Sequence, residues 1–193
     1  MNQPAKIQKR RTASRVDWLL ATLNVLRERG FEGVKVVAIA RKLGLTSGSF
    51  YWHFENIQDL LDAVLAYWEH TLTGHIIEDA LKFEGPPDER IRLLMHQVIR
   101  EDAGMLDSAI AVWAKSDAGA ALCFKRAMDR RFTFSSWLFE EVGFSPRDAE
   151  IRGRMMVMTL IGETTNGLKQ RQDWEDVIDR HWHILTDRDL SQK

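Results

Sequence analysis

The amino-acid sequence predicts an all-α protein of about nine helices, and three observations support this fold class. Apolar residues recur every three or four positions through nearly the whole chain, which is the period of an amphipathic helix. No segment alternates apolar and polar residues as a half-buried strand does. Glycine, proline and helix-capping side chains separate the apolar segments. With 45% hydrophobic residues in a chain of 193, these helices have enough apolar surface to build a core.

The N-terminal end of the chain is basic. Residues 1–13 are expected to form a flexible basic arm, and the first helix then begins at Ser14, where Asp17 completes a capping box, and runs to Gly30. Residues 1–54 contain ten Lys and Arg against three Asp and Glu, a net charge of +7, whereas the whole chain carries −1. The basic charge therefore favours a polyanionic partner for this end of the protein.

Residues 37–54 have the pattern of a helix-turn-helix that binds DNA. A short helix packs through Ile39 and ends at Gly44, which tolerates the positive φ of a left-handed cap. A second helix follows, anchored by Phe50 and Phe54 on one face. The alternative is a short helix of an ordinary bundle with its aromatic residues in the core. The residues expected to contact DNA are Lys35, Lys42, Thr46, Ser47, Gly48, Ser49, Tyr51, Trp52 and His53.

Several short motifs in this part of the chain resemble, in order and spacing, the tetracycline-repressor-like (TetR) family of bacterial regulators. They are Gly30-Phe31, Ile39-Ala40, Leu43-Gly44-Leu45, Ser47-Gly48, Phe50-Tyr51-Trp52-His53-Phe54 and Leu60-Leu61. The resemblance covers residues 14–66 and implies a three-helix DNA-binding domain there. It also implies an inducer pocket among helices five to eight and a dimer formed through helices eight and nine.

The chain departs from the family pattern at two positions. The family usually has Thr or Ser at the start of the first helix of the motif, where Lys35-Val36-Val37 stands here. It also commonly has Lys or Arg near the start of helix four, where this chain has Ile57. We therefore expect one helix cap to be absent and one phosphate contact to be lost or moved to Lys42 or the arm.

Residues 67–193 are expected to form a ligand-binding and dimerisation domain, a helical bundle. The fourth helix begins near Asn56 and continues past Ile76, and Gly85-Pro86-Pro87 ends it. Later helices are expected at residues 88–99, 107–115, 119–143, 146–169 and 173–186. Methionine and aromatic side chains are dense in residues 91–160, where they belong to the core first, although such side chains also line apolar cavities.

The residues expected to bind a ligand are Met95, Trp113, Met128, Phe132, Met155 and Glu163, with His96 and Asn166 as further polar candidates. Gly153, Gly162 and Gly167 would weaken a helix unless another helix approaches closely, so they indicate a dimer seam. The residues expected in that seam are Met155, Leu160, Gly162, Val177 and Ile178. The favoured ligand is apolar or amphipathic.

Known catalytic and metal-binding spacings are absent from the sequence, which predicts a protein that is not an enzyme and binds no metal or cofactor. His181 and His183 are two residues apart and so point to different helix faces. The single Cys123 excludes an internal disulfide and suits a reducing compartment. The longest apolar run, residues 155–162, is too short to cross a membrane. A cytoplasmic protein without membrane association is expected.

Together these features predict a homodimeric regulator of transcription, usually a repressor in the family it resembles, that binds double-stranded DNA and is released by a small molecule. One alternative is a helical small-molecule carrier or enzyme with a degenerate DNA-binding domain. Another is a DNA-binding protein controlled by no metabolite. DNA binding relieved by a ligand distinguishes the first prediction from both.

Overall fold

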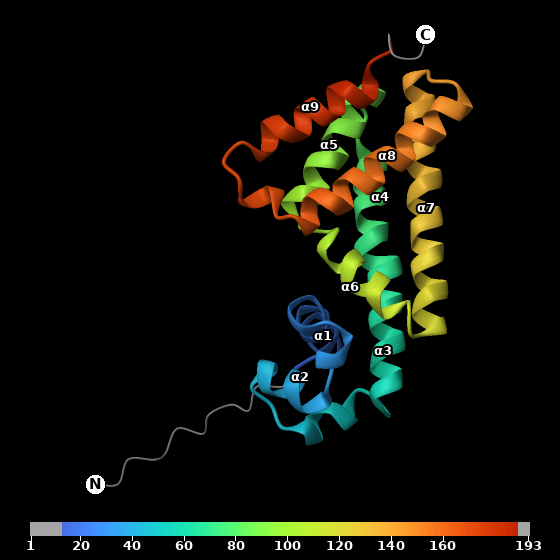
Figure 1. The fold of residues 1–193 in the computed structure, drawn as a ribbon. Coiled ribbons are helices and arrows are strands. Elements are labelled where there is room, and N and C mark those ends of the chain that lie inside the picture. The colour runs from blue at the N-terminus through green and yellow to red at the C-terminus, as the bar shows by residue number, and fades with distance from the viewer. Residues whose placement is uncertain (1–12, 189–193) are drawn as a thin grey trace. The chain divides into compact units, whose positions relative to one another are not determined.

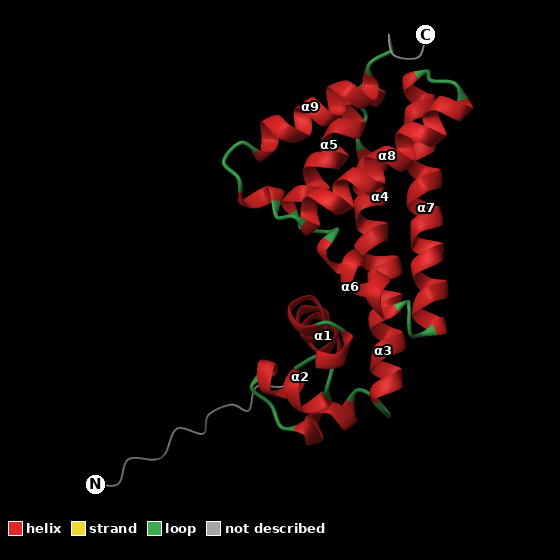
Figure 2. Cartoon of the chain, in the orientation of Figure 1, coloured by secondary structure: helices red, strands yellow, loops and turns green. Residues whose placement is uncertain are grey.

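The computed structural model describes residues 13–188, and every regular element within that range is a helix (Figures 1 and 2). Those residues form nine α-helices, three short 3-10 helices and one π-helical turn. The predicted all-α class is confirmed. The chain separates into two compact units, the first ending at Val64 and the second beginning at Leu65. The sequence-based boundary lay two residues later.

The first unit contains α1 (Arg15–Arg29), η1 (Phe31–Gly33), α2 (Val36–Leu43), η2 (Ser47–Trp52) and most of α3 (Ile57–Ala66). The capping box of α1 is present: Asp17 N–H donates to Ser14 Oγ, and Ser14 N–H donates to the Asp17 carboxylate. Gly44 ends α2 in the left-handed conformation, with φ 71°. The segment expected as the second helix of the motif is a 3-10 helix of six residues.

The second unit contains η3 (Tyr67–Leu72), α4 (Thr73–Lys82), α5 (Pro87–Arg100), α6 (Met105–Trp113), α7 (Ala118–Val142), α8 (Pro146–Thr165), η4 (Leu168–Gln170) and α9 (Trp174–Thr186). Gly143 ends α7 in the left-handed conformation, and Ser145 caps α8 with Pro146 in its first turn. The α8 helix ends four residues earlier than the sequence suggested, because Gly167 takes a positive φ of 76° and starts a new turn.

The long helix expected from Asn56 past Ile76 is continuous but not regular. It comprises α3, the π turn η3 and α4, and the backbone N–H of Thr73 donates to the carbonyl of Trp68, five residues earlier. A π-helical turn contains more residues than an α-helical turn, so side chains five residues apart lie on nearly the same face of the helix. Trp68 and Thr73 therefore point in similar directions.

The core of the second unit is formed by apolar side chains of α4, α5, α7, α8 and α9, among them Ile91, Met95, Phe139 and Ile178. At one edge of this core α9 is held to α5 by an ionic cluster. Arg92 donates two hydrogen bonds to Asp179, at 2.7 and 2.8 Å, and His96 Nε2 lies 2.7 Å from the same carboxylate. These bonds hold the pKa of Asp179 well below its usual range.

Candidate nucleic-acid interface and ligand cavity

The short helix η2 is anchored to the first unit by two buried rings. Phe50 and Phe54 are almost fully buried and stack with ring centroids 5.4 Å apart, and Phe50 meets the edge of Trp18 at 5.6 Å. Fully burying a phenyl ring contributes about 1.5–3 kcal/mol, which is ample to hold six residues in place. The anchoring function that the sequence predicted for both phenylalanines is thus present in the structure.

The opposite side of η2 exposes large aromatic groups to solvent. Tyr51 is 68% exposed and Trp52 is 87% exposed, although both carry extensive apolar surface. Of the other residues predicted to contact DNA, Lys35, Lys42, Thr46 and Gly48 are exposed, while Ser47, Ser49 and His53 are half-buried. The predicted set therefore lies at or near the surface of one short segment and of the helix before it. An exposed indole and phenol beside small hydroxyl groups suit contact with a second molecule.

The basic groups beside η2 have partners within the unit. Lys42 Nζ lies 2.6 Å from Glu28, and this contact lowers the pKa of the Glu28 carboxyl. Arg15 stacks its guanidinium over the Phe54 ring at 4.8 Å. Because the Lys42–Glu28 pair is exposed, it is weak, and Lys42 is able to exchange Glu28 for a phosphate at little cost.

The two departures from the family pattern have structural consequences. Lys35 occupies the N-cap position of α2, and its side chain makes no capping hydrogen bond, as expected from the absence of Ser or Thr. Ile57 is 37% exposed at the first position of α3. The basic arm of residues 1–13, the alternative place for the phosphate contact, lies outside the described residues except for its last one.

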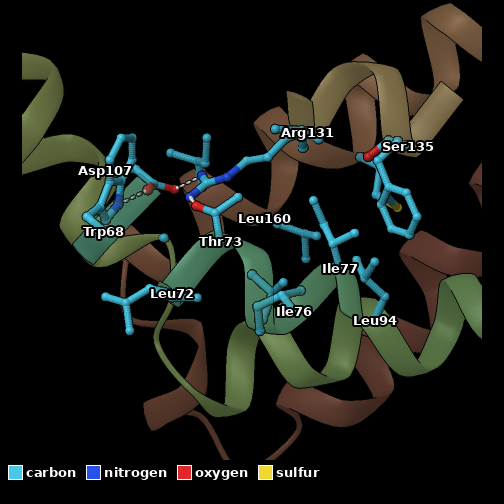
Figure 3. Close-up of a pocket in the computed structure, with 17 residues that line it drawn as sticks. Trp68, Leu72, Thr73, Ile76, Ile77, Leu94, Asp107, Arg131, Ser135 and Leu160 are labelled. Carbon is cyan, nitrogen blue, oxygen red and sulfur yellow. Dashed lines mark hydrogen bonds and ion pairs between the residues drawn. The ribbon is translucent and has the colours of Figure 1, made fainter. Parts of the chain in front are cut away.

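An apolar cavity of about 70 Å³ lies inside the second unit, among η3, α4, α5, α6, α7 and α8 (Figure 3). Its walls are mostly aliphatic, and they include Ile76, Ile77, Leu94, Met156, Leu160 and Ile161. Gly104 brings the start of α6 against α8, because a Cβ at this position would come within 2.1 Å of Thr164 Oγ1. Any larger residue there would separate the two helices that close this side of the cavity.

One end of the cavity is polar, and Figure 3 shows the side chains that form it. Arg131 donates to Asp107 Oδ2 at 2.5 Å and to Thr73 Oγ1 at 2.8 Å, while the Trp68 indole N–H donates to Asp107 Oδ1 at 3.1 Å. The Asp107 side chain is 2% exposed. Burial raises the pKa of Asp107, and the bonds from Arg131 and Trp68 act against that rise. The π turn allows Trp68 and Thr73 to reach the same ion pair.

Sequence reasoning missed this polar end. Its four members come from η3, α4, α6 and α7, so no short spacing relates them along the chain. The available signals were weak: an Asp in a predicted apolar helix and a Trp and Thr five residues apart. Neither signal shows which side chain is the hydrogen-bond partner until the tertiary structure is known.

The six residues predicted to bind a ligand do not line this cavity. Met95, Trp113 and Met128 are buried elsewhere in the unit, and Met155 is 51% exposed on α8. Phe132 packs under the guanidinium of Arg154 at 4.3 Å, and Glu163 faces His181. The ligand contacts predicted for these residues stay predictions, since the helical period identifies apolar residues without showing which neighbour each one meets. His96 and Asn166 also lie outside the cavity lining.

The residues predicted for a dimer seam divide into two groups. Leu160 is 3% exposed and Ile178 is fully buried, so both side chains pack against their own chain. Met155 is exposed, while Gly162 and Val177 are half-buried. Gly153, which also suggested the seam, instead packs against α7, since a Cβ there would come within 2.7 Å of the Ser136 nitrogen.

No group of three or more His, Cys, Asp or Glu side chains is placed to hold a metal ion between residues 13 and 188. None of the described helices combines the length and apolar character needed to cross a bilayer. Cys123 is buried, and burial together with the Glu69 carboxylate raises the pKa of its thiol to about 12. The thiol is therefore protonated and a poor nucleophile at neutral pH.

Comparison with known proteins bears on the first unit most directly. Residues 19–64, which include the anchored η2 segment and its exposed aromatic residues, match the sequence pattern of bacterial regulatory proteins of the tetR family. The similarity to the tetR family covers this segment of the chain. The resemblance that the sequence motifs suggested is thus confirmed, and the matched segment coincides closely with the first compact unit.

A curated relative shows how far this sequence similarity extends along the chain. The HTH-type transcriptional regulator SrpR of Pseudomonas putida is 42% identical over 52 residues, which are 27% of this chain and 24% of that protein. The match therefore spans about a quarter of each protein. That relative is described as a transcriptional regulator.

Solved structures extend the similarity of fold to both units of the chain. A TetR transcriptional regulator from Legionella pneumophila aligns with a TM-score of 0.76 and 12% identity, covering 95% of this chain and all of that one. The regulator FadR from Bacillus subtilis, solved in complex with stearoyl-CoA, aligns with a TM-score of 0.68 and 16% identity over 90% of this chain and 98% of its own. These similarities support the fold of both units as the described residues show it.

Proposed function

We propose that this protein is a DNA-binding regulator of transcription whose DNA affinity is lowered by a small molecule held in the second unit. The single observation that carries the proposal is the anchored η2 segment, which exposes Tyr51 and Trp52 beside small polar residues inside the part of the chain that matches the tetR family. The small serines and Gly48 suit close approach to base edges, and Tyr51, Trp52 and His53 suit contact with the sugar-phosphate backbone.

We propose that the protein acts as a homodimer through α8 and α9. Ile151, Met155 and Met158 on α8 are spaced four and three residues apart, so they lie on one helix face, and each is about half exposed. Ile184 on α9 is 57% exposed as well. A two-fold dimer places its two recognition segments in successive major grooves, about 34 Å apart or a multiple of that distance.

The proposed link between ligand and DNA runs through the helix that contains the π turn. Trp68 in η3 and Thr73 at the start of α4 border the cavity, and η3 directly follows α3, which begins in the first unit. A ligand that displaces the Trp68 indole or the Thr73 hydroxyl acts on this helix. Coupling of about 1–3 kcal/mol between two sites is typical of such systems.

Selection of bound fragments from the source genome tests the proposal. We expect enrichment of palindromic sites, with an affinity that falls steeply as salt concentration rises because phosphate contacts release counterions. Sedimentation should give twice the chain mass, and Met155→Glu should weaken both the dimer and DNA binding. Leu122→Glu is the matched control, since Leu122 on α7 is 57% exposed against 51% for Met155. A monomeric protein, or one without DNA preference that still binds small molecules, would favour the carrier or enzyme alternative.

A further inference from the structure

The charge balance of the cavity determines which ligands it accepts. Of the residues described as lining it, Asp107 and Arg131 carry the formal charges, and they form an ion pair at 2.5 Å with the Asp107 side chain almost fully buried. The two acceptor oxygens of Asp107 already receive hydrogen bonds from Trp68 and Arg131. The polar end of the cavity therefore has no excess charge.

An ionised ligand would disturb this balance. A carboxylate placed beside Arg131 would compete with Asp107 and leave two acidic groups to share one cation, while an ammonium group would compete with Arg131 for Asp107. Either arrangement leaves a charge uncompensated in an apolar environment, which is strongly unfavourable. A neutral hydroxyl or carbonyl oxygen has no such cost.

A neutral polar group also has a partner available. The guanidinium of Arg131 carries five N–H donors, and the bonds to Asp107 and Thr73 use two of them. The remaining walls, such as Ile76, Leu94 and Leu160, suit a hydrocarbon body. The volume of about 70 Å³ is several times the roughly 10–15 Å³ that one water molecule requires, so a molecule of several non-hydrogen atoms fits without large movement of the walls.

We infer that the cavity binds an uncharged, mainly apolar small molecule that carries one hydrogen-bonding oxygen and places it at Arg131 and Asp107. This inference rests on the proposed function, because it specifies the ligand class of the same cavity. Neutral alcohols and ketones, fatty acids and cationic amphiphiles are all amphipathic. The inference selects the neutral alcohols and ketones among them and excludes the two ionised classes.

Three probes of equal chain length test the inference: 1-hexanol, hexanoate and hexylammonium, titrated calorimetrically into the full-length protein at pH 7, where the acid and the amine are both ionised. Hexanol should bind at least about tenfold more tightly than either ion, since an ionised headgroup costs far more to desolvate than a hydroxyl does. Preference for hexanoate or hexylammonium, or the absence of binding by all three, would overturn the inference.

Two single variants reverse the selectivity if the ion pair controls it. Asp107→Asn leaves a positive Arg131 and should shift the preference toward hexanoate by at least about tenfold, whereas Arg131→Gln leaves a negative Asp107 and should shift it toward hexylammonium by a similar factor. An unchanged preference in both folded variants would contradict the inference. The double variant, neutral at both positions, should still favour hexanol, and it provides the test if a single variant does not fold.

Failure of this inference is distinguishable from failure of the proposed function. Operator affinity measured with and without saturating 1-hexanol reports on regulation alone. If hexanol binds with the expected selectivity and leaves operator affinity unchanged, the ligand class is supported and the proposed ligand control of DNA binding fails. If hexanoate binds and lowers operator affinity, the regulator is supported and the neutral-ligand inference is wrong.

Discussion

Residues 46–54 of the first unit, called the recognition segment here after their proposed role, and the polar end of the cavity in the second unit are built in opposite ways. The recognition segment is contiguous: Phe50 and Phe54 anchor it, and Tyr51 and Trp52 between them face solvent. The polar end of the cavity is assembled from four elements separated by up to 63 residues, and it faces inward. The proposed DNA contact therefore depends on side chains that contribute little to stability, whereas the proposed ligand contact uses groups that also hold the second unit together.

The largest expected change in stability comes from a substitution at the polar end of the cavity. Asp107→Ala should destabilise the second unit by about 3–5 kcal/mol, because it leaves the guanidinium of Arg131 without its buried counter-charge. Chemical denaturation measures this loss. Adding Arg131→Met should restore part of the stability, since a neutral apolar pair has no unpaired charge. A double variant less stable than Asp107→Ala alone would show that the charge pair is not the cause.

A smaller effect is expected at the edge of the same network. Trp68→Phe removes the indole N–H that donates to Asp107 and keeps the ring in place, so it should cost about 1–3 kcal/mol for a buried acceptor that loses one donor. Denaturation of Trp182→Phe provides the control, because the Trp182 indole N–H donates to a half-buried backbone carbonyl at Asp88 and the cost should be lower. Equal losses of unfolding free energy in the two variants would mean that burial of Asp107 does not strengthen its bond from Trp68.

The recognition segment is contiguous and the polar end of the cavity is not, and this difference determined how much of each could be predicted from the sequence. Ser14, Gly44 and Gly143 mark helix ends through bonds within a few residues, so the sequence predicted those ends correctly. The aromatic residues of the recognition segment were noticed because they form one contiguous motif, with Phe50 and Phe54 four residues apart on one helix face. The π turn was not, because a bond from Thr73 to Trp68 is favoured only when both side chains reach partners on α6 and α7.

The dimer residues illustrate a second limit. Helical periodicity identified Leu160, Ile178 and Met155 alike as apolar positions, yet only Met155 is substantially exposed. The sequence indicates that an apolar side chain will be buried, but it does not show whether residues of the same chain or of a partner chain bury it. The 3-10 form of η2 is a related case, since residues 47–52 are too few for their periodicity to distinguish it from an α-helix.

The smallest stability effect is expected on the recognition side. Lys42→Ala removes an exposed ion pair with Glu28 and should change the free energy of unfolding by less than about 0.5 kcal/mol. The same variant should reduce the salt dependence of DNA binding by the equivalent of about one phosphate contact. Lys82→Ala, at an exposed ion pair on α4, is the control and should leave both quantities unchanged. A Lys42 variant with an unaltered salt dependence would exclude this lysine from the DNA contact.

The operator affinity of the Tyr51→Ala/His53→Ala double variant tests the central claim most directly, namely that the outward side chains of the recognition segment bind DNA without supporting the fold. We expect a loss of about 1–3 kcal/mol in operator binding, with a denaturation curve within about 0.5 kcal/mol of the wild type. Leu81→Ala, an exposed apolar position on α4, should change neither. Unchanged operator affinity in a fully folded double variant would contradict the claim.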